Sequence, residues 1–363
     1  MSKLLIIGAG WEQYALIEEA KKQGHYIIAT HPAMNTDGFS LADRFFVKDS
    51  RDIAAHLEIA KTRQVDAVVT DNCDYSFYTA AVVSASLGLH FASLESAIHS
   101  NDKVAQRVSC QKKGLTQPEF YPIQTLSELH SAADQLGFPL IIKPIDSRGT
   151  FGVTIVKEEA GLEHAFFEAL TNSPSRKVIC ERFIKGTLVT VDGFCFKNGH
   201  RSLTVASRVF EDGPKPITKE IIYPAEFSES LKTNILKAHE QVVEALNYQY
   251  GHTHGEYIVT DREEVYLVEC TNRGGGVYTS SSIVPNLTGI NLNEILINQS
   301  LGTDSFEAPD QENDYMIKSS MLTFLDFEEG KVIKSINIGE LKSLPYVLKY
   351  RSVYHEDDMV EPK

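Results

Sequence analysis

The chain has 363 residues, of which 42% are hydrophobic and 23% are charged, so we expect a water-soluble globular protein of two or three domains. The formal net charge of -14 disfavours binding to nucleic acid, which needs clusters of lysine and arginine that are absent from this sequence. No apolar run is long enough for a membrane span, and the five cysteines show no disulfide or zinc spacing, which favours a cytoplasmic location.

The first 95 residues alternate strands and helices, a pattern typical of a parallel α/β sheet. The predicted strands are Lys3–Ile7, His25–Thr30 and Asp66–Thr70, and the predicted helices are Tyr14–Lys22, Ile53–Lys61 and Tyr78–Ser86. A turn at Gly8 and Gly10 resembles the start of a dinucleotide fingerprint, but Gln13 replaces its third glycine, and no acidic residue ends the second strand. We therefore disfavour NAD. We expect the strand-end loops Gly8–Gln13 and Thr70–Asp74 to wall a small-molecule site.

The next segment predicts a helix over Lys103–Lys112, preceded by the capping cluster Ser100–Asp102. Lys103 lies in the first turn, where a positive charge opposes the helix dipole, so it is either incidental or has an anionic partner. A second unit follows. Its predicted helices are Leu126–Leu136 and Leu162–Leu170, and its predicted strands are Leu140–Pro144, Thr154–Lys157 and Val178–Ile184.

A glycine-bearing turn over residues 146–153 joins the strand that contains Lys143 to the next strand. The backbone N–H groups of such a turn can donate to phosphate oxygens, because glycine permits a close approach. It lacks the pattern of a Walker motif. A phosphate-covering hairpin and an ordinary glycine-rich hairpin both fit this turn.

The rest of the chain predicts paired strands over Leu188–Phe196 and Leu203–Val209, a proline-rich loop over 211–220 and a long helix over Leu231–Leu246. A further helix is expected over Asn291–Ser300. The tail from Met316 predicts short strands.

The most informative stretch runs from Gly255 to Gly276 and predicts a hairpin with a four-residue turn over 261–264. That turn places Glu256 directly opposite Glu269, with their Cβ atoms roughly 5 Å apart. Two carboxylates so close repel each other unless a cation lies between them, and Mg²⁺ prefers such oxygen ligands. Arg273 and three glycines follow and can hold an anion. The alternative is a surface hairpin with two solvated glutamates.

Together these features make the chain resemble the ATP-grasp superfamily over nearly its whole length. The features are Lys103, Lys143, the 149–152 turn, Glu181, the Glu256/Glu269 pair and Arg273, in this order. The resemblance implies an N-terminal parallel-sheet α/β domain, two α+β lobes that hold ATP between them, and a small β-rich C-terminal piece. The implied division is 1–95 for the first domain, 96–114 for a linker helix, 115–185 for the lid lobe, 186–310 for the catalytic lobe and 311–363 for the C-terminal subdomain.

The resemblance also implies a role for each site residue. The residues expected to bind ATP are Lys103, Lys143, Gly149, Thr150, Phe151, Gly152, Glu181, Phe183 and Ile184. The two lysines would contact the α and β phosphates, the turn would cover the triphosphate, and the strand from 181 to 184 would bind adenine through Glu181 and the backbone of Phe183 or Ile184. Glu256 and Glu269 would hold Mg²⁺. Arg273, with Gly274 and Gly275, would bind the reacting carboxylate, and Arg273 and Lys143 are the expected catalytic residues.

Two positions depart from the family pattern. Leu188 stands where an acidic ribose ligand is usual, so the ribose ligand stays open. Thr271 stands where asparagine is usual, which leaves the third metal ligand open between Thr271, Asn272 and water. His252 and His254 are candidate general bases, although packing or capping is the simpler role for each.

These expectations define an ATP-dependent carboxylate-amine ligase that forms an amide through an acyl phosphate, with ATP and Mg²⁺ as cofactors and small-molecule substrates, amino acids among them. Two alternatives stay open. One is an enzyme that activates bicarbonate, as in purine or carbamoyl phosphate synthesis. The other is an ATP-binding regulatory protein without turnover. A homodimer is also left open.

Overall fold

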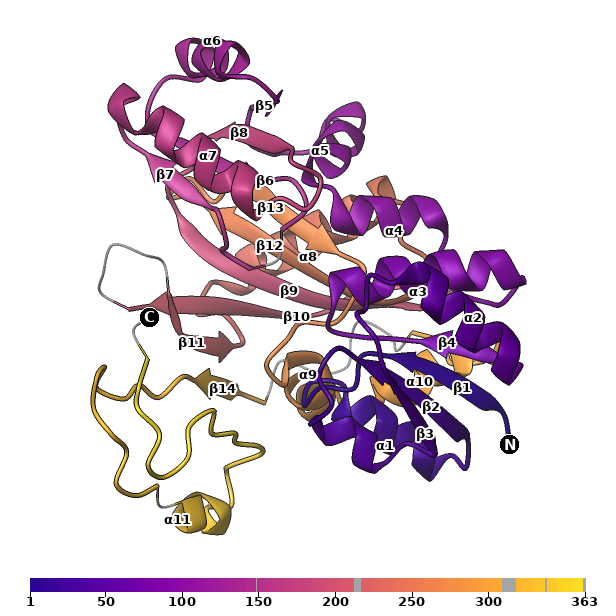
Figure 1. Ribbon diagram of the computed structural model, residues 1–363. Coiled ribbons are helices and arrows are strands. Elements are labelled where there is room, and N and C mark those ends of the chain that lie inside the picture. Colours follow the sequence, from indigo (N-terminus) through magenta and orange to yellow (C-terminus); the bar gives the residue numbers. More distant parts are fainter. Residues whose placement is uncertain (148, 212–216, 309–317, 337, 362–363) are drawn as a thin grey trace.

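The computed structural model describes residues 1–147, 149–211, 217–308, 318–336 and 338–361. The N-terminal domain is a parallel sheet in the order β3-β2-β1-β4 with helices on both faces (Figure 1). Its strands are β1 (Lys3–Ile7), β2 (Tyr26–His31), β3 (Arg44–Val47) and β4 (Ala67–Val69), and its helices are α1 (Tyr14–Lys22), η1 (Asp37–Ser40), α2 (Ile53–Arg63), α3 (Asp74–Leu87) and α4 (Leu94–Asn101). The predicted parallel sheet is confirmed. The strand β3 was missed because it is short and mostly exposed.

A second, smaller body follows the helix α5 (Lys103–Lys112). It is an antiparallel sheet in the order β5-β8-β6-β7. Its elements are β5 (Phe120–Ile123), α6 (Leu126–Leu136), β6 (Leu140–Pro144), β7 (Thr154–Val156), η2 (Glu159–Gly161), α7 (Leu162–Asn172) and β8 (Val178–Arg182). The apolar faces of α6 and α7 pack on one face of this sheet and form its core. The remaining face is free to carry polar groups.

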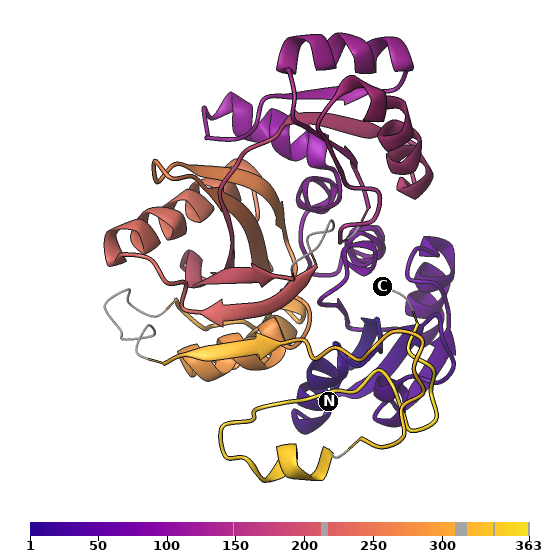
Figure 2. The same cartoon turned by 90° about the vertical axis from the view of Figure 1, so that its left-hand side faces the viewer.

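The third body is a six-stranded antiparallel sheet in the order β13-β12-β9-β10-β11-β14. Its elements are β9 (Thr187–Phe196), β10 (Gly199–Phe210), β11 (Thr218–Tyr223), α8 (Glu229–Ala245), β12 (Gly251–Val259), β13 (Val265–Thr271), η3 (Thr279–Ile283), α9 (Val284–Thr288), α10 (Leu292–Ser300) and β14 (Ser320–Thr323). Helix α8 packs on one face through buried residues such as Ile235 and Val242. Figure 2 shows the smaller lobe above this sheet and the N-terminal domain beside it.

One continuous apolar core joins the N-terminal domain to the six-stranded sheet. It contains Leu4 and Ile6 of β1, Phe194 of β9 and Leu296 of α10, all nearly inaccessible to solvent. Helix α10, which follows β13 in the chain, packs against α1 and β4. The loop after β13 is tied to the loops that follow β4 and β1, because Gly274 N–H donates to Asp71 and Val277 N–H donates to Glu12. This packing positions the functional site.

The β12–β13 hairpin pairs Glu256 with Glu269, as predicted, but its turn and its strand register differ from the expected ones. The connection is five residues long, Thr260–Glu264, and Val259 rather than Thr260 pairs with Val265. A β-bulge between Glu256 and Tyr257 then shifts the register by one residue. The two carboxylates are therefore opposite each other because two deviations from a regular hairpin cancel.

Two other segments differ from the sequence-based expectation. Residues 212–216 of the expected loop over 211–220 lie outside the described residues, but Thr218 already begins strand β11, which pairs with β10. In the described part of the tail, regular structure consists of β14, an isolated bridge between Val332 and Met359, and the helix α11 (Ile338–Ser343). Strand β11 is held between β10 and β14, and β14 is the part of the tail that joins the sheet. No helix among the described residues is long and apolar enough to cross a membrane.

Candidate functional site

Lys103 opens helix α5 and points at the hairpin. Asp102 caps the helix by accepting hydrogen bonds from the N–H groups of Val104 and Ala105. The Lys103 Nζ lies 2.9 Å from Glu269 Oε2 and donates to the Ser147 carbonyl at 3.1 Å. The anionic partner anticipated for Lys103 is therefore Glu269.

Glu181 on β8 is buried between two cations. Its Oε1 accepts from Arg107 Nε at 2.8 Å, and its Oε2 is 2.8 Å from Lys143 Nζ on β6. Burial opposes the charge on Glu181, but Arg107 and Lys143 together lower the pKa of Glu181 below its ordinary value. The Glu181 carboxylate, expected to bind adenine, thus already has two partners in this structure.

Arg107 is a site residue that the sequence analysis missed. It lies one helical turn after Lys103, so both side chains leave α5 on the same face. The i, i+4 spacing of two cations on one helix was the available signal. Its Nη2 also donates to the Val268 carbonyl at 2.7 Å, so Arg107 links the lid-lobe sheet to strand β13.

The charge state of Glu269 follows from its surroundings. Burial disfavours its charged form, but Lys103, and more remotely Lys143 and Arg273, outweigh this effect and lower the pKa of Glu269 to about 2. Burial likewise disfavours the charged form of Lys143, and with Arg107 and Lys103 nearby its pKa is lowered despite Glu181. The site is an alternating array of positive and negative groups.

The other hairpin carboxylate, Glu256, is bound by Arg208 from β10 at 2.5 Å. Each opposed carboxylate therefore has its own cation. Among the described residues, no cluster of three or more His, Cys, Asp or Glu side chains has the arrangement of a metal site. Two opposed carboxylates still match the ligand set of Mg²⁺, which usually takes one or two carboxylates together with substrate phosphates and water.

The two residues considered for a third metal ligand occupy different environments. Asn272 is fully buried: its Oδ1 accepts from Ser96, and its Nδ2 donates to the carbonyls of Tyr250 and His252. Thr271 lines the same narrow cleft as Glu269. Asn272 is therefore a structural anchor. The candidates that remain for a third metal ligand are Thr271 and water.

Arg273 is held by the N-terminal domain. Its Nε and Nη2 bind the two oxygens of Asp74, the first residue of α3, at 3.0 and 3.3 Å. Burial opposes the charge, but Asp74 raises the pKa of Arg273 above its ordinary value. The guanidinium is thus permanently charged and fixed at the edge of the cleft that Lys103 and Glu269 line.

The glycines after Arg273 are needed for close approach. A Cβ on Gly275 would lie 2.9 Å from His254 Nδ1 and 3.0 Å from Asp192 Oδ1. The N–H of Gly274 donates to Asp71 Oδ1 at 2.6 Å. In this structure the Gly274 amide, expected near the substrate, is therefore used to tie the segment to the N-terminal domain.

The remaining predicted ATP-binding residues lie at the rim of the lid lobe. Gly149 and Gly152 have φ angles of +60° and +73°, which favour glycine, and Thr150 and Phe151 between them are exposed. The N–H of Phe183 donates to the Pro139 carbonyl at 3.3 Å, so this backbone donor is already used within the protein.

His254 forms a buried pair with Asp192. Its Nδ1 lies 2.7 Å from Asp192 Oδ1, and the other Asp192 oxygen accepts from the Tyr223 hydroxyl at 3.0 Å. On β12, His254 and Glu256 are two residues apart and so face the same side of the sheet. This pair lies beneath the glycine segment that follows Arg273.

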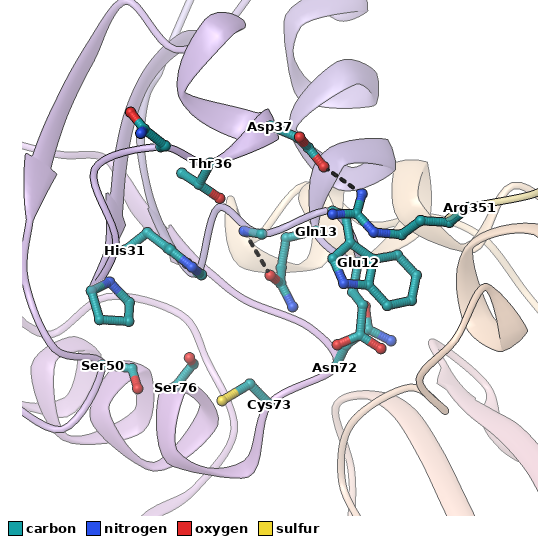
Figure 3. Close-up of a pocket in the computed structure, with 15 residues that line it drawn as sticks. Glu12, Gln13, His31, Thr36, Asp37, Ser50, Asn72, Cys73, Ser76 and Arg351 are labelled. Carbon is teal, nitrogen blue, oxygen red and sulfur yellow. Dashed lines mark hydrogen bonds and ion pairs between the residues drawn. The ribbon is translucent and has the colours of Figure 1, made fainter. Parts of the chain in front are cut away.

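A second cavity, of about 350 Å³, opens at the carboxyl ends of the parallel strands, as the sequence analysis expected of the loops Gly8–Gln13 and Thr70–Asp74 (Figure 3). Asn72 and Cys73 line it, while the adjacent Asp74 and Tyr75 line the cleft at Lys103 and Glu269. The two hollows therefore lie on either side of one loop.

Comparison with known proteins agrees with this geometry. A model of the ATP-grasp domain matches residues 136–281. Two relatives are a formate-dependent phosphoribosylglycinamide formyltransferase of Bacteroides fragilis, 27% identical over 55% of this chain and 55% of the relative, and a D-alanine–D-alanine ligase of Bordetella avium, 30% identical over 51% and 59%. The chain spans a little over half the length of the curated relatives it matches.

Among solved structures, an L-amino acid ligase from Bacillus licheniformis shares the fold with a TM-score of 0.83, covering 100% of this chain and 90% of that one at 20% identity. The matched model identifies an ATP-grasp domain at residues 136–281, and the relatives and the shared fold agree with this assignment. The predicted fold class, a parallel-sheet domain followed by antiparallel ATP-grasp lobes, is confirmed.

Proposed function

We propose that this protein is an ATP-dependent, ADP-forming carboxylate-amine ligase for small molecules. The observation that carries the proposal is the assembly of Lys103, Glu269 and Arg273 around one cleft, with the buried Lys143 and Glu181 behind it. These groups come from α5 and from the second and third bodies of the fold, and Asp74 of the N-terminal domain holds Arg273. An array of this kind provides what phosphoryl transfer to a carboxylate needs, namely cations for the phosphates and a fixed cation for the acceptor.

In the first step the γ-phosphoryl group of ATP passes to the substrate carboxylate, giving an acyl phosphate and ADP. Lys103 exchanges its ion pair with Glu269 for contacts with phosphate oxygens. Lys143 on β6 supplies a second positive charge. Glu256 and Glu269 would hold Mg²⁺, which would supply positive charge to the phosphate groups. Arg273, anchored by Asp74, orients the carboxylate.

In the second step the amine attacks the acyl carbon, the carbon–oxygen bond to phosphate breaks, and inorganic phosphate leaves. The amine nitrogen loses a proton. His254 is suited to accept it, because Asp192 binds Nδ1 and Nε2 has no hydrogen-bond partner among the described residues. Asp192 acts here as a positioning residue that fixes the imidazole.

The proposal is tested by trapping the acyl phosphate with hydroxylamine, which replaces the unknown amine and yields a hydroxamate. Purified protein is incubated with ATP, Mg²⁺, hydroxylamine and one carboxylate at a time from a panel of amino acids, other small organic acids and bicarbonate. We expect ADP release and hydroxamate formation with at least one organic acid and neither product with Glu269→Gln. ADP release with bicarbonate alone would replace the proposal by carboxyphosphate chemistry. ATP binding without ADP release under every condition would refute turnover.

A further inference from the structure

The cavity in the N-terminal domain has the wrong chemistry for a phosphate. Such sites usually present free backbone N–H groups at a glycine turn before a helix. Here four of the six backbone donors of the turn Gly8–Gln13 are used within the domain: Gly8 to the Thr30 carbonyl at 3.0 Å, Ala9 to His31 Nδ1 at 3.3 Å, Gly10 to Gln13 Oε1 at 3.1 Å, and Gln13 to the Gly10 carbonyl at 3.1 Å. The Gln13 side chain, which breaks the dinucleotide fingerprint, thus occupies a donor that a phosphate would need.

The side chains that line the cavity also disfavour a phosphate. Among the described lining residues the only lysine or arginine is Arg351, and it is paired with Asp37 at 2.8 Å and stacked over Trp11. His31 adds no charge near neutral pH: burial lowers its pKa, and its Nδ1 accepts the Ala9 N–H. Glu12 lines the cavity and forms no ion pair among the described residues. The lining therefore carries one net negative charge and favours a cation.

Glu12 also connects the cavity to the reacting end of the site. Its Oε1 accepts from the Val277 N–H at 2.8 Å, and a Cβ on Gly276 would lie 2.7 Å from the same oxygen. These residues belong to the short segment that follows Arg273. A group bound at Glu12 is thus next to the chain that carries the carboxylate-orienting arginine. Figure 3 shows Glu12, Asn72 and Arg351 grouped at one side of the cavity.

We infer that this cavity binds the amine substrate, and that this substrate is a small primary amine without a phosphate group. Its ammonium group is recognised by Glu12, which forms no ion pair among the described residues. The volume of about 350 Å³ suits a small metabolite. The inference rests on the proposed ligase function, which it deepens by naming the class of amine.

The single tryptophan of the chain, Trp11, lines this cavity and gives a direct binding signal that is independent of turnover. Its fluorescence is titrated with two matched pairs, L-serine against O-phospho-L-serine and ethanolamine against O-phosphoethanolamine, with and without ADP and Mg²⁺. We expect a saturable change with an unphosphorylated member and a Kd at least 10-fold higher for its phosphorylated partner. An equal or tighter Kd for the phosphorylated partner, or no response to either pair, would overturn the inference.

Glu12→Gln tests the charge alone, because glutamine keeps an acceptor for the Val277 N–H. We expect this variant to weaken amine binding at least 10-fold while its circular dichroism and ADP binding stay as in the wild type. Glu58→Gln, an exposed charge change on α2 of the same domain, is the matched control and leaves the Kd unchanged. Equal Kd values for Glu12→Gln and the wild type would show that Glu12 only ties down the segment at Val277.

Failure of this inference and failure of the ligase function give different results. If hydroxamate forms but phosphorylated amines are preferred, the ligase function stands and the assignment of the amine falls. If unphosphorylated amines bind at Trp11 in a Glu12-dependent way but no hydroxamate forms, the cavity is assigned correctly and the ligase chemistry is wrong.

Discussion

Replacing Glu269 by glutamine tests how much the Lys103–Glu269 ion pair stabilises the protein, through the pH dependence of the free energy of unfolding. The carboxylate is 2.9 Å from Lys103, and its pKa in the folded protein is about 2, against an ordinary value of 4.5. Each pKa unit corresponds to about 1.4 kcal/mol, so the charged form contributes at most about 3 kcal/mol to folding. The side chain keeps a 20% exposure, so solvent screening reduces this to about 2 kcal/mol.

The sign follows from the direction of the shift. Because the folded-state pKa is below the unfolded-state value, the stabilisation is fully present above pH 4.5 and is lost as the pH falls toward 2. Glutamine carries no charge at any pH. We therefore expect Glu269→Gln to unfold more easily than the wild type at pH 7 by about 2 kcal/mol, and this difference to shrink to less than half by about pH 3.

The measurement is urea unfolding, followed by circular dichroism, of both proteins at pH 7, 5, 4 and 3. Glu263→Gln is the matched control, since Glu263 is an exposed residue in the turn of the same hairpin. A difference that stays constant across this range would refute the reasoning, because it would arise from lost packing and not from the charge. Equal free energies of unfolding at pH 7 would show that the Lys103–Glu269 pair contributes no net stability.

Three further predictions concern other contacts of the site. Arg107→Met leaves the buried Glu181 with one cation in place of two, so we expect a loss of about 3 kcal/mol in urea unfolding at pH 7; an unchanged midpoint would contradict the buried triad. Gly275→Ala forces a Cβ against His254, so hydroxamate formation should fall at least 10-fold while the far-UV circular dichroism is retained; full activity would show that the segment moves freely. Asp192→Asn should lower kcat with the natural amine and change its pH profile, with little effect on the carboxylate KM; a parallel rise in KM would indicate a purely structural role.

Much of the site could be predicted from local sequence. The cap at Asp102 fixed the start of α5 and so the place of Lys103, and the β-rich runs on either side of a polar turn indicated the hairpin that pairs Glu256 with Glu269. Glycines at 149 and 152 indicated a turn with positive φ angles. These features depend on short-range geometry, since caps, turns and cross-strand pairs join residues that are close in sequence.

The partners of these groups could not be predicted in the same way. Glu181 takes Arg107 from 74 residues away, and the segment at Gly274 is tied to Asp71 from 203 residues away. Nothing in the local pattern around either residue encodes its distant partner. Even the pairing of Glu256 with Glu269 depends on a β-bulge that no pattern in the sequence predicts.

The sequence by itself determined the class of protein and the chemical groups available to it, because secondary-structure periodicity, caps and glycine turns are local properties. Only the tertiary structure decided which charges are paired, that Asn272 is an anchor, and that the loop from Asp71 to Asp74 separates two hollows. The physical reason is that burial and long-range pairing arise when the apolar faces of β1, β9 and α10 pack into one core. That packing brings Glu12 to Val277, and with it the cavity that we assign to the amine.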